Sequence, residues 1–280
     1  MTPLPPLLLE PLVRGALIED LGPAGDVTTR AVIPDGLRYS ARLNARADGV
    51  VSGMQLAAMA FGLVDSALKI ETLRPDGSRV SAGETLMRIE GAAASILSGE
   101  RVALNFAGRL SGIATLTAAF VPETKGTKAR ITCTRKTTPG LRLVEKEAVL
   151  HGGGAAHRYG LSDAILIKDN HISAAGGIAA VLNAARAHAS HMRRIQIEVD
   201  TLAQLDEVLD TGGADVVLLD NMPTEMLAEA VARVDRRLVT EASGNMRLER
   251  IAEVARTGVD FISVGALTHS APVLDLGLDF

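Results

Sequence analysis

The 280-residue sequence contains no tryptophan, and only 2% of its residues are aromatic. Proteins that bind single-stranded nucleic acid stack its bases on aromatic side chains, so this scarcity argues against that function. The only cysteine, Cys133, excludes an internal disulfide and any metal cluster held by several cysteines. It lies in an apolar stretch, where a cysteine is typically a small core residue rather than a nucleophile.

Long hydrophobic runs and a basic N-terminal segment are also lacking. No window contains the roughly 18 apolar residues that a membrane-spanning helix needs. Residues 1–7 include three prolines and no basic residue, unlike a signal peptide. The sequence therefore predicts a cytoplasmic protein that does not contact a membrane.

The chain carries a net charge of −4, yet its positive charge is concentrated in one segment. Residues 125–168 contain nine Lys and Arg against three acids, a local excess of six positive charges. Nucleic-acid-binding proteins usually spread basic residues over a whole face of a basic domain. A compact positive segment in an acidic chain instead indicates a pocket for a small, multiply charged anion, and no nucleic-acid partner is expected.

The C-terminal half repeats a pattern of short apolar runs followed by polar residues. The apolar runs are 129–133, 164–167, 195–197, 216–219, 238–240 and 261–264. Segments of helical period lie between most of them, at 201–209, 224–234 and 248–255, with Thr201 and Thr224 as expected N-caps and Gly258 as an expected C-terminal glycine. This alternation predicts parallel strands joined by right-handed crossovers, and it favours a (β/α) barrel. Active-site groups of such barrels lie at the carboxyl ends of the strands, where the polar residues fall.

The first hundred residues have a different pattern. Residues 37–47 alternate crudely, and residues 80–91 are typical of a short hairpin, similar to the half-barrel turn of biotinyl and lipoyl carriers but without their lysine. Residues 100–121 predict a long helix that bridges two domains. We expect an N-terminal α+β sandwich-like domain at 1–108 and a barrel domain at 109–270. The alternating tail, 271–280, is predicted to pack back on the N-terminal domain as a strand.

Several ordered motifs resemble the quinolinate phosphoribosyltransferase family, also called nicotinate-nucleotide pyrophosphorylase (carboxylating). They are Glu19–Gly22, Gly25–Thr29, Glu100–Phe106, Arg109–Thr115, Thr134–Arg142, Gly152–Gly154 with His157 and Arg158, Leu166–His171, Leu219–Met222, Glu241–Gly244 and Ile262–Ser270. The resemblance covers nearly the whole chain. It implies an α/β protein, with an incomplete (β/α) TIM-like barrel after the N-terminal domain. It also implies a Mg²⁺-dependent homodimer that transfers phosphoribosyl from phosphoribosyl pyrophosphate to quinolinate and releases carbon dioxide, a step of NAD biosynthesis.

Quinolinate carries two carboxylates, and planar guanidinium groups match carboxylates with two hydrogen bonds. We therefore expect Arg135 and Arg158 to bind them, with His157 beside them and Lys168 from the next strand end. Thr134 precedes this set, and Lys136 is expected near the pyrophosphate leaving group. By resemblance, Arg101 reaches the same substrate from the partner subunit.

Phosphate is commonly bound by backbone N–H groups in the last loops of a barrel. These loops contain Ser243, Gly244 and Asn245, and Val264, Gly265 and Ala266. The family usually has two glycines after the serine, and Asn245 replaces the second one. Asn tolerates the left-handed backbone conformation, so the loop is expected to be intact.

Two carboxylates at strand ends, Glu198 and Asp220, suit the ribose hydroxyls and a Mg²⁺ ion held directly or through water. Together with Lys136 and Lys168 they form the predicted catalytic set. Glu241 is expected either at the site or as a buried partner of one of the cations. His151 and His171 are left open as substrate contacts.

Three alternatives remain at this stage. One is a related pyrophosphorylase-like protein associated with molybdenum transport, and another is nicotinate phosphoribosyltransferase, whose monocarboxylate substrate needs fewer cations. The third, from a different class, is a carrier or ligand-binding module built on the biotinyl-like segment. It would leave the charged strand ends of the second half without a purpose.

Overall fold

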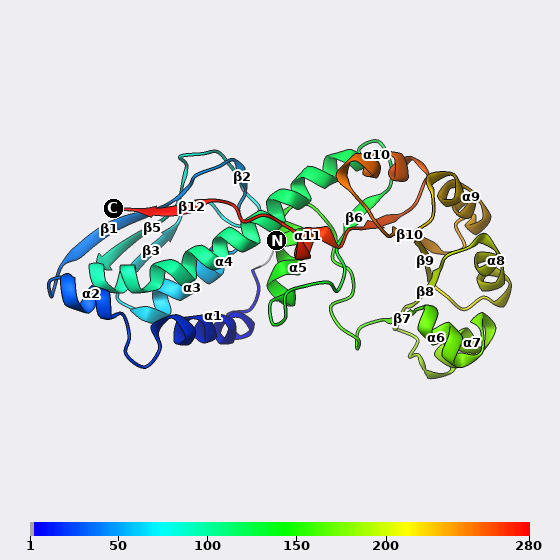
Figure 1. Ribbon diagram of the computed structural model, residues 1–280, viewed down its shortest axis with the longest axis horizontal. Coiled ribbons are helices and arrows are strands. Elements are labelled where there is room, and N and C mark those ends of the chain that lie inside the picture. The colour runs from blue at the N-terminus through cyan, green and yellow to red at the C-terminus, as the bar shows by residue number, and fades with distance from the viewer. Residues whose placement is uncertain (1–2) are drawn as a thin grey trace. The chain divides into compact units, whose positions relative to one another are not determined.

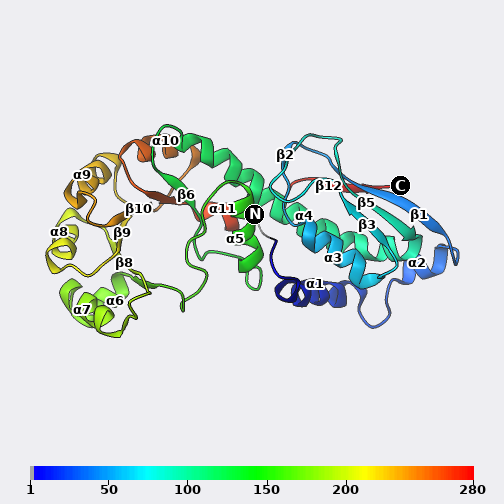
Figure 2. The same cartoon turned by 180° about the vertical axis from the view of Figure 1, so that it is seen from behind.

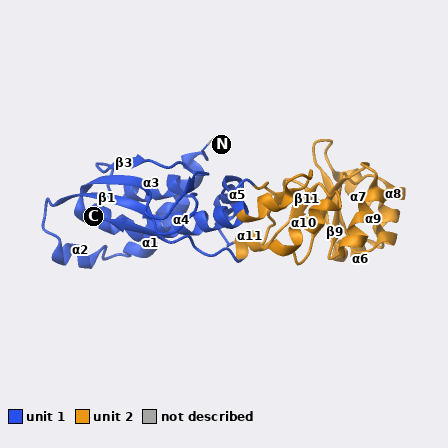
Figure 3. Cartoon of the chain, turned by 90° about the horizontal axis from the view of Figure 1, so that it is seen from above, with its two compact units in different colours: residues 1–118, 138–153, 270–280 blue, residues 119–137, 154–269 orange. Residues whose placement is uncertain are grey.

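The computed structural model describes residues 3–280 and separates two compact units (Figure 3). Unit 1 extends to residue 118 and adds 138–153 and 270–280, whereas unit 2 contains 119–137 and 154–269. The boundary differs from the one expected at residue 108 because helix α4, Ala93–Phe120, continues through it. Helix α5, Arg142–His151, belongs to unit 1, since its buried Glu145 pairs with Arg109 of α4 at 2.9 Å.

Unit 1 contains an antiparallel sheet in the order β12-β1-β5-β3. Its strands are β1 (Arg38–Ala45), β3 (Lys69–Thr72), β5 (Thr85–Ala92) and β12 (Leu276–Asp279). Strand β12 comes from the alternating tail and pairs with β1, with Leu278 opposite Leu43. Met87, Ile89 and Gly91 of β5 are buried and alternate with exposed Arg88 and Glu90. The sheet therefore has one face directed at the core of unit 1.

Helices of unit 1 cover one face of this sheet (Figure 1). Helix α3 (Met54–Val64) and helix α4 lie on it, and α1 (Pro6–Leu21) packs against α3. Leu9, Val13 and Leu17 of α1 recur every fourth residue and are buried. The short helix α2 (Val27–Val32) begins after Asp26, whose side chain accepts the Thr29 N–H at 2.9 Å.

The hairpin expected at residues 80–91 is wrong. Strand β4 (Arg79–Val80) pairs with β2 (Gly49–Val50), while β5 pairs with β1 and β3. Between β4 and β5, Gly83 has a φ of 87°, a left-handed conformation that favours glycine, and the chain turns from one sheet to another there. The turn residues were predicted correctly, but a turn signal does not specify which strands pair.

Helix α4 also corrects an expectation about hydrophobic runs. Residues Ala93–Thr124 are long and apolar enough, by length and composition, to cross a membrane. However, 56% of the apolar window is buried inside the protein. Arg109 within the helix is bound to buried Glu145, and Ile96, Leu110 and Ile113 are buried. The contacts are those of the central core helix of a globular unit.

Unit 2 is an open, six-stranded parallel sheet in the order β6-β11-β10-β9-β8-β7. The strands are β6 (Arg130–Thr132), β7 (Ile165–Ile167), β8 (Ile195–Val199), β9 (Val216–Asp220), β10 (Val239–Ser243) and β11 (Phe261–Ser263). The helices are η1 (Val121–Thr124), α6 (Asp169–Ala175), α7 (Ile178–His188), α8 (Leu202–Thr211), α9 (Thr224–Val234), α10 (Leu248–Arg256) and α11 (Ala266–His269). Helices α7 to α10 lie along the outside of the curved sheet (Figures 1 and 2). The predicted incomplete barrel is confirmed.

Local sequence signals explain most of these boundaries. All six apolar runs form strands, and the three periodic segments form α8, α9 and α10. Thr201 caps α8 by accepting the Gln204 N–H, and Gly258 follows α10 with a φ of 91°, as predicted. Thr224 is not an N-cap, because that position is Pro223, which has no hydroxyl, and Thr224 is the first residue of the helix.

Candidate active site

A cavity of about 790 Å³ opens at the carboxyl ends of the unit 2 strands. Its polar and charged lining residues are Thr134, Arg135, Lys136, His157, Arg158, Lys168, Glu198, Asp220, Asn221, Glu241, Ser243, Asn245, Arg247, Ser263 and His269. They come from all six strand ends and the loops that follow. The parallel arrangement brings together residues that are up to 135 positions apart, as Thr134 and His269 are.

Three of these residues, Arg135, His157 and Arg158, make one end of the cavity cationic. Arg158 donates from Nη1 to the carbonyl of Ala164 at 2.9 Å, which fixes its head. Burial and the positive charge of Arg135 lower the pKa of Arg158, while Asp163 opposes them. Nε of Arg135 and Nε of Arg158 are buried, and neither has a hydrogen-bond partner within residues 3–280. Buried donors of this kind are suited to an anionic ligand.

An ionised carboxylate lies beneath this end. Glu241 of β10 is only 5% exposed, and its Oε2 lies 3.5 Å from Nε2 of His157. The same oxygen accepts a hydrogen bond from Nε2 of Gln196 at 2.8 Å. Burial alone would raise the pKa of Glu241, but hydrogen bonds from His157, Gln196 and Ser263 and the charge of His157 outweigh it and hold this pKa below its usual value.

The lining also contains the two carboxylates predicted to bind metal, Glu198 of β8 and Asp220 at the end of β9. Lys168 Nζ forms an ion pair with Oε2 of Glu198, and Asp220 Oδ2 accepts a hydrogen bond from Asn221 at 2.6 Å. Burial, Asp220 and Asp169 raise the pKa of Asp200 nearby, with Lys168 opposing. Within the described chain, no three His, Cys, Asp or Glu residues gather as a metal site. Two hard oxygen donors suit a Mg²⁺ ion that keeps several waters and binds a ligand phosphate, so the residues fit it.

The loops after β10 and β11 present backbone to the cavity. Gly244 has a φ of 92°, and a Cβ there would lie 2.2 Å from Oδ1 of Asn221. Asn245 has a φ of 49° and donates from Nδ2 to the same oxygen at 3.4 Å. The substitution by Asn245 therefore keeps the left-handed turn, as expected. Thr268 of α11 donates to the carbonyl of Lys136 at 2.7 Å and ties the loop after β6 to this side.

Most predicted site residues line the cavity, with two exceptions. Val264 is 1% exposed and its N–H donates to the carbonyl of Thr132, so only its neighbours Gly265 and Ala266 reach the cavity. Arg101 is an exposed residue of α4 in unit 1. Of the histidines left open, His171 accepts the Lys168 N–H at 2.9 Å and caps α6, and His151 belongs to unit 1.

Sequence reasoning missed four polar residues of the lining, which are Asn221, Arg247, Ser263 and His269. Each had a signal: Asn221 directly follows Asp220, Arg247 lies just after the phosphate loop, Ser263 interrupts an apolar run, and His269 falls one helical turn after Gly265. Asn221 and Arg247 lie on loops that follow strand ends, whereas Ser263 ends β11 and His269 ends α11.

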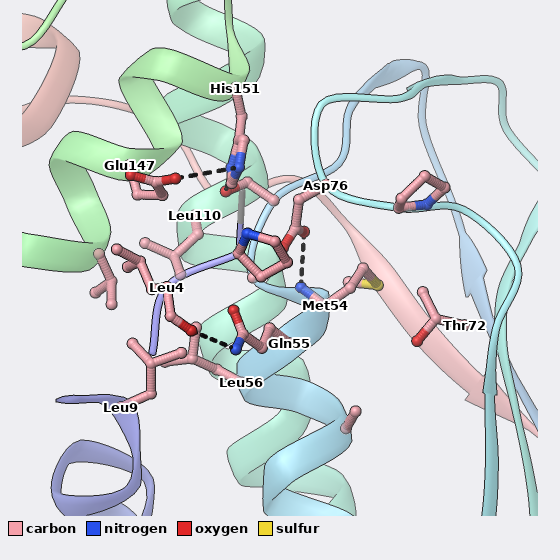
Figure 4. Close-up of a pocket in the computed structure, with 16 residues that line it drawn as sticks. Leu4, Leu9, Met54, Gln55, Leu56, Thr72, Asp76, Leu110, Glu147 and His151 are labelled. Atoms are coloured by element: carbon pink, nitrogen blue, oxygen red, sulfur yellow. Dashed lines mark hydrogen bonds and ion pairs between the residues drawn. The ribbon is translucent and has the colours of Figure 1, made fainter. Parts of the chain in front are cut away.

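A second cavity, of about 440 Å³, lies within unit 1 (Figure 4). Ser52 Oγ lies 2.8 Å from Nδ1 of His151, and Nε2 of His151 lies 3.8 Å from Glu147. Asp76 accepts the Met54 N–H at 2.9 Å, and burial raises the pKa of Asp76 against hydrogen bonds and the charge of His151. With two carboxylates and no Lys or Arg among its lining residues, this cavity is not suited to an anion.

The fold and the cavity define an open α/β-barrel protein with an anion-binding site at the strand ends. Family models for quinolinate phosphoribosyltransferase match this chain over residues 26–111 for the N-terminal domain and 113–279 for the C-terminal domain. The chain belongs to the quinolinate phosphoribosyltransferase family.

Curated relatives and a solved structure agree with this assignment. The nicotinate-nucleotide pyrophosphorylase (carboxylating) of Mycobacterium leprae is 43% identical over 95% of this chain and 95% of its own. Quinolinate phosphoribosyltransferase (decarboxylating) 1b of Nicotiana tabacum is 44% identical over 96% of this chain and 81% of its own. The nicotinate-nucleotide pyrophosphorylase structure from Francisella tularensis superposes with a TM-score of 0.94 at 37% identity, covering 99% and 97% of the two chains.

Proposed function

We propose that the unit 2 cavity transfers the phosphoribosyl group of phosphoribosyl pyrophosphate to the ring nitrogen of quinolinate, with decarboxylation. The products are nicotinate mononucleotide, pyrophosphate and carbon dioxide, as in NAD biosynthesis. The enzyme is accordingly a pentosyltransferase. The observation that carries the proposal is the half-buried group of Arg135, His157 and Arg158, in which the Nε atoms of both arginines are buried and which supplies positive charge for a dicarboxylate.

Quinolinate binds at the cationic end. Arg135 and Arg158 each offer two parallel N–H groups to one carboxylate, and His157 and Lys168 add charge beside them. The charge of Lys168 is held in place by Glu198, so its head is oriented before the substrate arrives. Arg101 from a partner subunit completes this end in our proposal, which makes the functional unit a homodimer.

The activated sugar binds along the opposite wall. The backbone of Ser243, Gly244, Asn245, Gly265 and Ala266 receives the 5′-phosphate, and Glu198 and Asp220 bind the ribose hydroxyls. Lys136, with Thr134 beside it, neutralises the pyrophosphate leaving group. When bound, Mg²⁺ at Glu198 and Asp220, directly or through water, supplies further charge neutralisation to the pyrophosphate.

The chemistry needs alignment more than proton transfer. The pyridine nitrogen already has a lone pair, so its attack on the anomeric carbon requires no general base. The C–O bond to pyrophosphate breaks as the C–N bond forms, through a transition state with oxocarbenium character. The protein contributes orientation of both substrates and charge at the leaving group. The alkylated ring nitrogen is then positive and accepts electron density as the bond to the carboxylate breaks and carbon dioxide leaves. The ring carbon that carried it takes a proton from water to complete nicotinate mononucleotide.

The alternatives fit less well. A monocarboxylate such as nicotinate does not require so many cations, and neither the family nor the named relatives point to molybdenum transport. A carrier domain presents a lysine in its hairpin turn, whereas residues 81–84 between β4 and β5 are Ser, Ala, Gly and Glu. We propose a soluble, cytoplasmic enzyme.

A product assay with carboxyl-labelled quinolinate tests the proposal. The wild-type protein should release labelled carbon dioxide and form nicotinate mononucleotide, and nicotinate should not replace quinolinate. Arg135→Ala should raise the KM for quinolinate about 100-fold, since a charged bidentate contact contributes roughly 3 kcal/mol, and should leave the KM for phosphoribosyl pyrophosphate within about threefold. Equal weakening of both substrates would show that the division of the cavity is wrong.

A further inference from the structure

The cationic end of the cavity contains one feature that the proposed reaction does not use. Glu241 lies among the groups expected to bind a dianion, yet a carboxylate repels carboxylates. Glu241 is 5% exposed, and the side chain of His157 is 13% exposed. A buried negative charge at an anion site is costly unless it performs some task.

Glu241 is held in place from across the sheet. In the strand order, β9 separates β10 from β8, so Gln196 of β8 reaches past a whole strand to donate to Oε2 of Glu241 at 2.8 Å. Ser263 of β11, on the other side, adds a hydrogen bond that favours the ionised form. Hydrogen bonds from strands on both sides of β10 thus fix the carboxylate. Both donors are buried, since Gln196 is 7% exposed and Ser263 is 4% exposed.

Among residues 3–280, the basic side chain paired with this carboxylate is that of His157. Nε2 of the ring lies 3.5 Å from Oε2 of Glu241. Burial and the charge of Arg135 lower the pKa of Arg158 at the same end of the cavity. A carboxylate that binds one nitrogen of an imidazole fixes the orientation of the ring.

We propose that Glu241, fixed by Gln196, is a positioning residue that orients the His157 imidazole beside Arg135 and Arg158. This inference rests on the proposed function, because it assigns His157 to the dicarboxylate. Glu241 acts through His157 and does not itself contact the substrate. The oriented ring is therefore a hydrogen-bond donor for one of the two carboxylates of quinolinate.

Other charged groups around the cavity do not substitute for Glu241. They are Arg135, Lys136, Arg158, Lys168, Glu198, Asp220, Arg247 and His269. The two acids among them are engaged elsewhere, Glu198 with Lys168 and Asp220 with Asn221. His269 is another imidazole in the lining, so the test must separate it from His157.

The test measures KM and kcat for each substrate in the wild type and in Glu241→Gln. Without the carboxylate, the imidazole is no longer held in place, so the loss falls on the substrate that the ring contacts. The KM for quinolinate should rise about tenfold, whereas kcat and the KM for phosphoribosyl pyrophosphate should stay within about twofold.

Matched variants make the result specific. Combining Glu241→Gln with His157→Gln should weaken quinolinate binding no more than His157→Gln alone, since Glu241 acts through that ring, and His269 is unchanged in both. Glu241→Asp keeps a carboxylate and should recover part of the quinolinate affinity that Glu241→Gln loses. Gln196→Leu leaves the charge but frees the carboxylate, and should raise the KM for quinolinate about threefold.

A Glu241→Gln penalty that is absent, equal for both substrates, or additive with that of His157→Gln would overturn the proposal. If Glu241→Gln does not fold, a Gln196→Leu variant that leaves the KM for quinolinate unchanged, or weakens both substrates equally, overturns it instead. Calorimetric binding of quinolinate needs no turnover: a wild type that never binds quinolinate would refute the proposed function, whereas a wild type and a Glu241→Gln variant that bind it equally well would refute only this inference.

Discussion

Single residues at the strand ends determine what this cavity can bind. Gly244 is the clearest case, because its φ of 92° and the 2.2 Å approach of a Cβ to Asn221 leave no room for a side chain. Asn245 adopts a φ of 49°, which Asn accepts at lower cost than other non-glycine residues. Two adjacent left-handed residues thus form the turn with only one glycine.

A substitution pair tests this difference. Gly244→Ala should destabilise the protein by about 1–3 kcal/mol, through the backbone conformation and the clash with Asn221, and should raise the KM for phosphoribosyl pyrophosphate. Denaturant unfolding and steady-state kinetics measure both effects.

The matched control is Asn245→Gly, which restores a glycine pair and should change stability by less than about 1 kcal/mol. If Gly244→Ala and Asn245→Gly change stability and the KM for phosphoribosyl pyrophosphate by the same amount, position 244 has no special need for glycine.

At the scale of single residues, the sequence predicted which side chains line the cavity better than it predicted their hydrogen-bond partners. Arg135, Arg158 and Lys168 were expected from charge and from their places after apolar runs, and they line the cavity. The pairing of Glu241 with Gln196 could not be foreseen, because it joins strands that are not adjacent in the sheet. Hydrogen bonds across a sheet interior depend on curvature, which apolar periodicity does not encode.

Among the elements, those of unit 2 follow directly from periodicity, whereas those of unit 1 do not. Parallel strands in a covered sheet are short apolar runs that stop at polar residues, so β6 to β11 are readable from sequence. In unit 1 the pairing of β5 with β1 and β3 joins segments far apart in the chain, and the adjacent β4 pairs elsewhere. Local patterns identify strands but cannot assign distant antiparallel partners.

Helix α2 offers a test at the scale of one element. Asp26 caps this six-residue helix, and its hydrogen bonds with Thr29 lower the pKa of Asp26 despite some burial. Because the pKa of Asp26 is lower in the folded state, the ionised carboxylate stabilises the fold at pH values above the pKa of the unfolded state. This stabilisation is lost as the pH falls through the pKa of the folded state.

Asp26→Ala should therefore cost about 1 kcal/mol at pH 7, measured by denaturant unfolding. The difference from wild type should shrink between about pH 5 and pH 3 as the wild-type carboxyl is protonated. A difference that stays constant over this range would show that the cap acts without its charge. Asp35→Ala, a substitution of an exposed acid just after α2, is a suitable control.

For the whole molecule, the chain divides its proposed site residues between the two units. Arg101 is exposed on α4 of unit 1, whereas all the other predicted site residues belong to unit 2. Arg101 has no salt-bridge partner within residues 3–280. The resemblance to the family places this arginine at the site of a partner subunit, and the sequence alone could not derive that geometry.

Subunit mixing tests this prediction. Arg101→Ala and Arg135→Ala should each be nearly inactive alone. If Arg101 acts across a dimer interface, each mixed dimer has one intact site, and random mixing should restore about a quarter of wild-type activity. No recovery would place Arg101 at the site of its own chain or away from catalysis. Mixing Arg135→Ala with Arg158→Ala, which alter the same site, should restore nothing.

The pairing of β12 with β1 has a consequence for how the protein is made. Residues 276–279 complete a sheet whose other strands lie within residues 38–92, and Asp279 also binds Asn44 and Arg46. While the ribosome is still translating the barrel, β1 presents an unpaired backbone edge that can recruit strands of other nascent chains. Translation pauses in the second half would therefore prolong the period in which the first half is prone to aggregate.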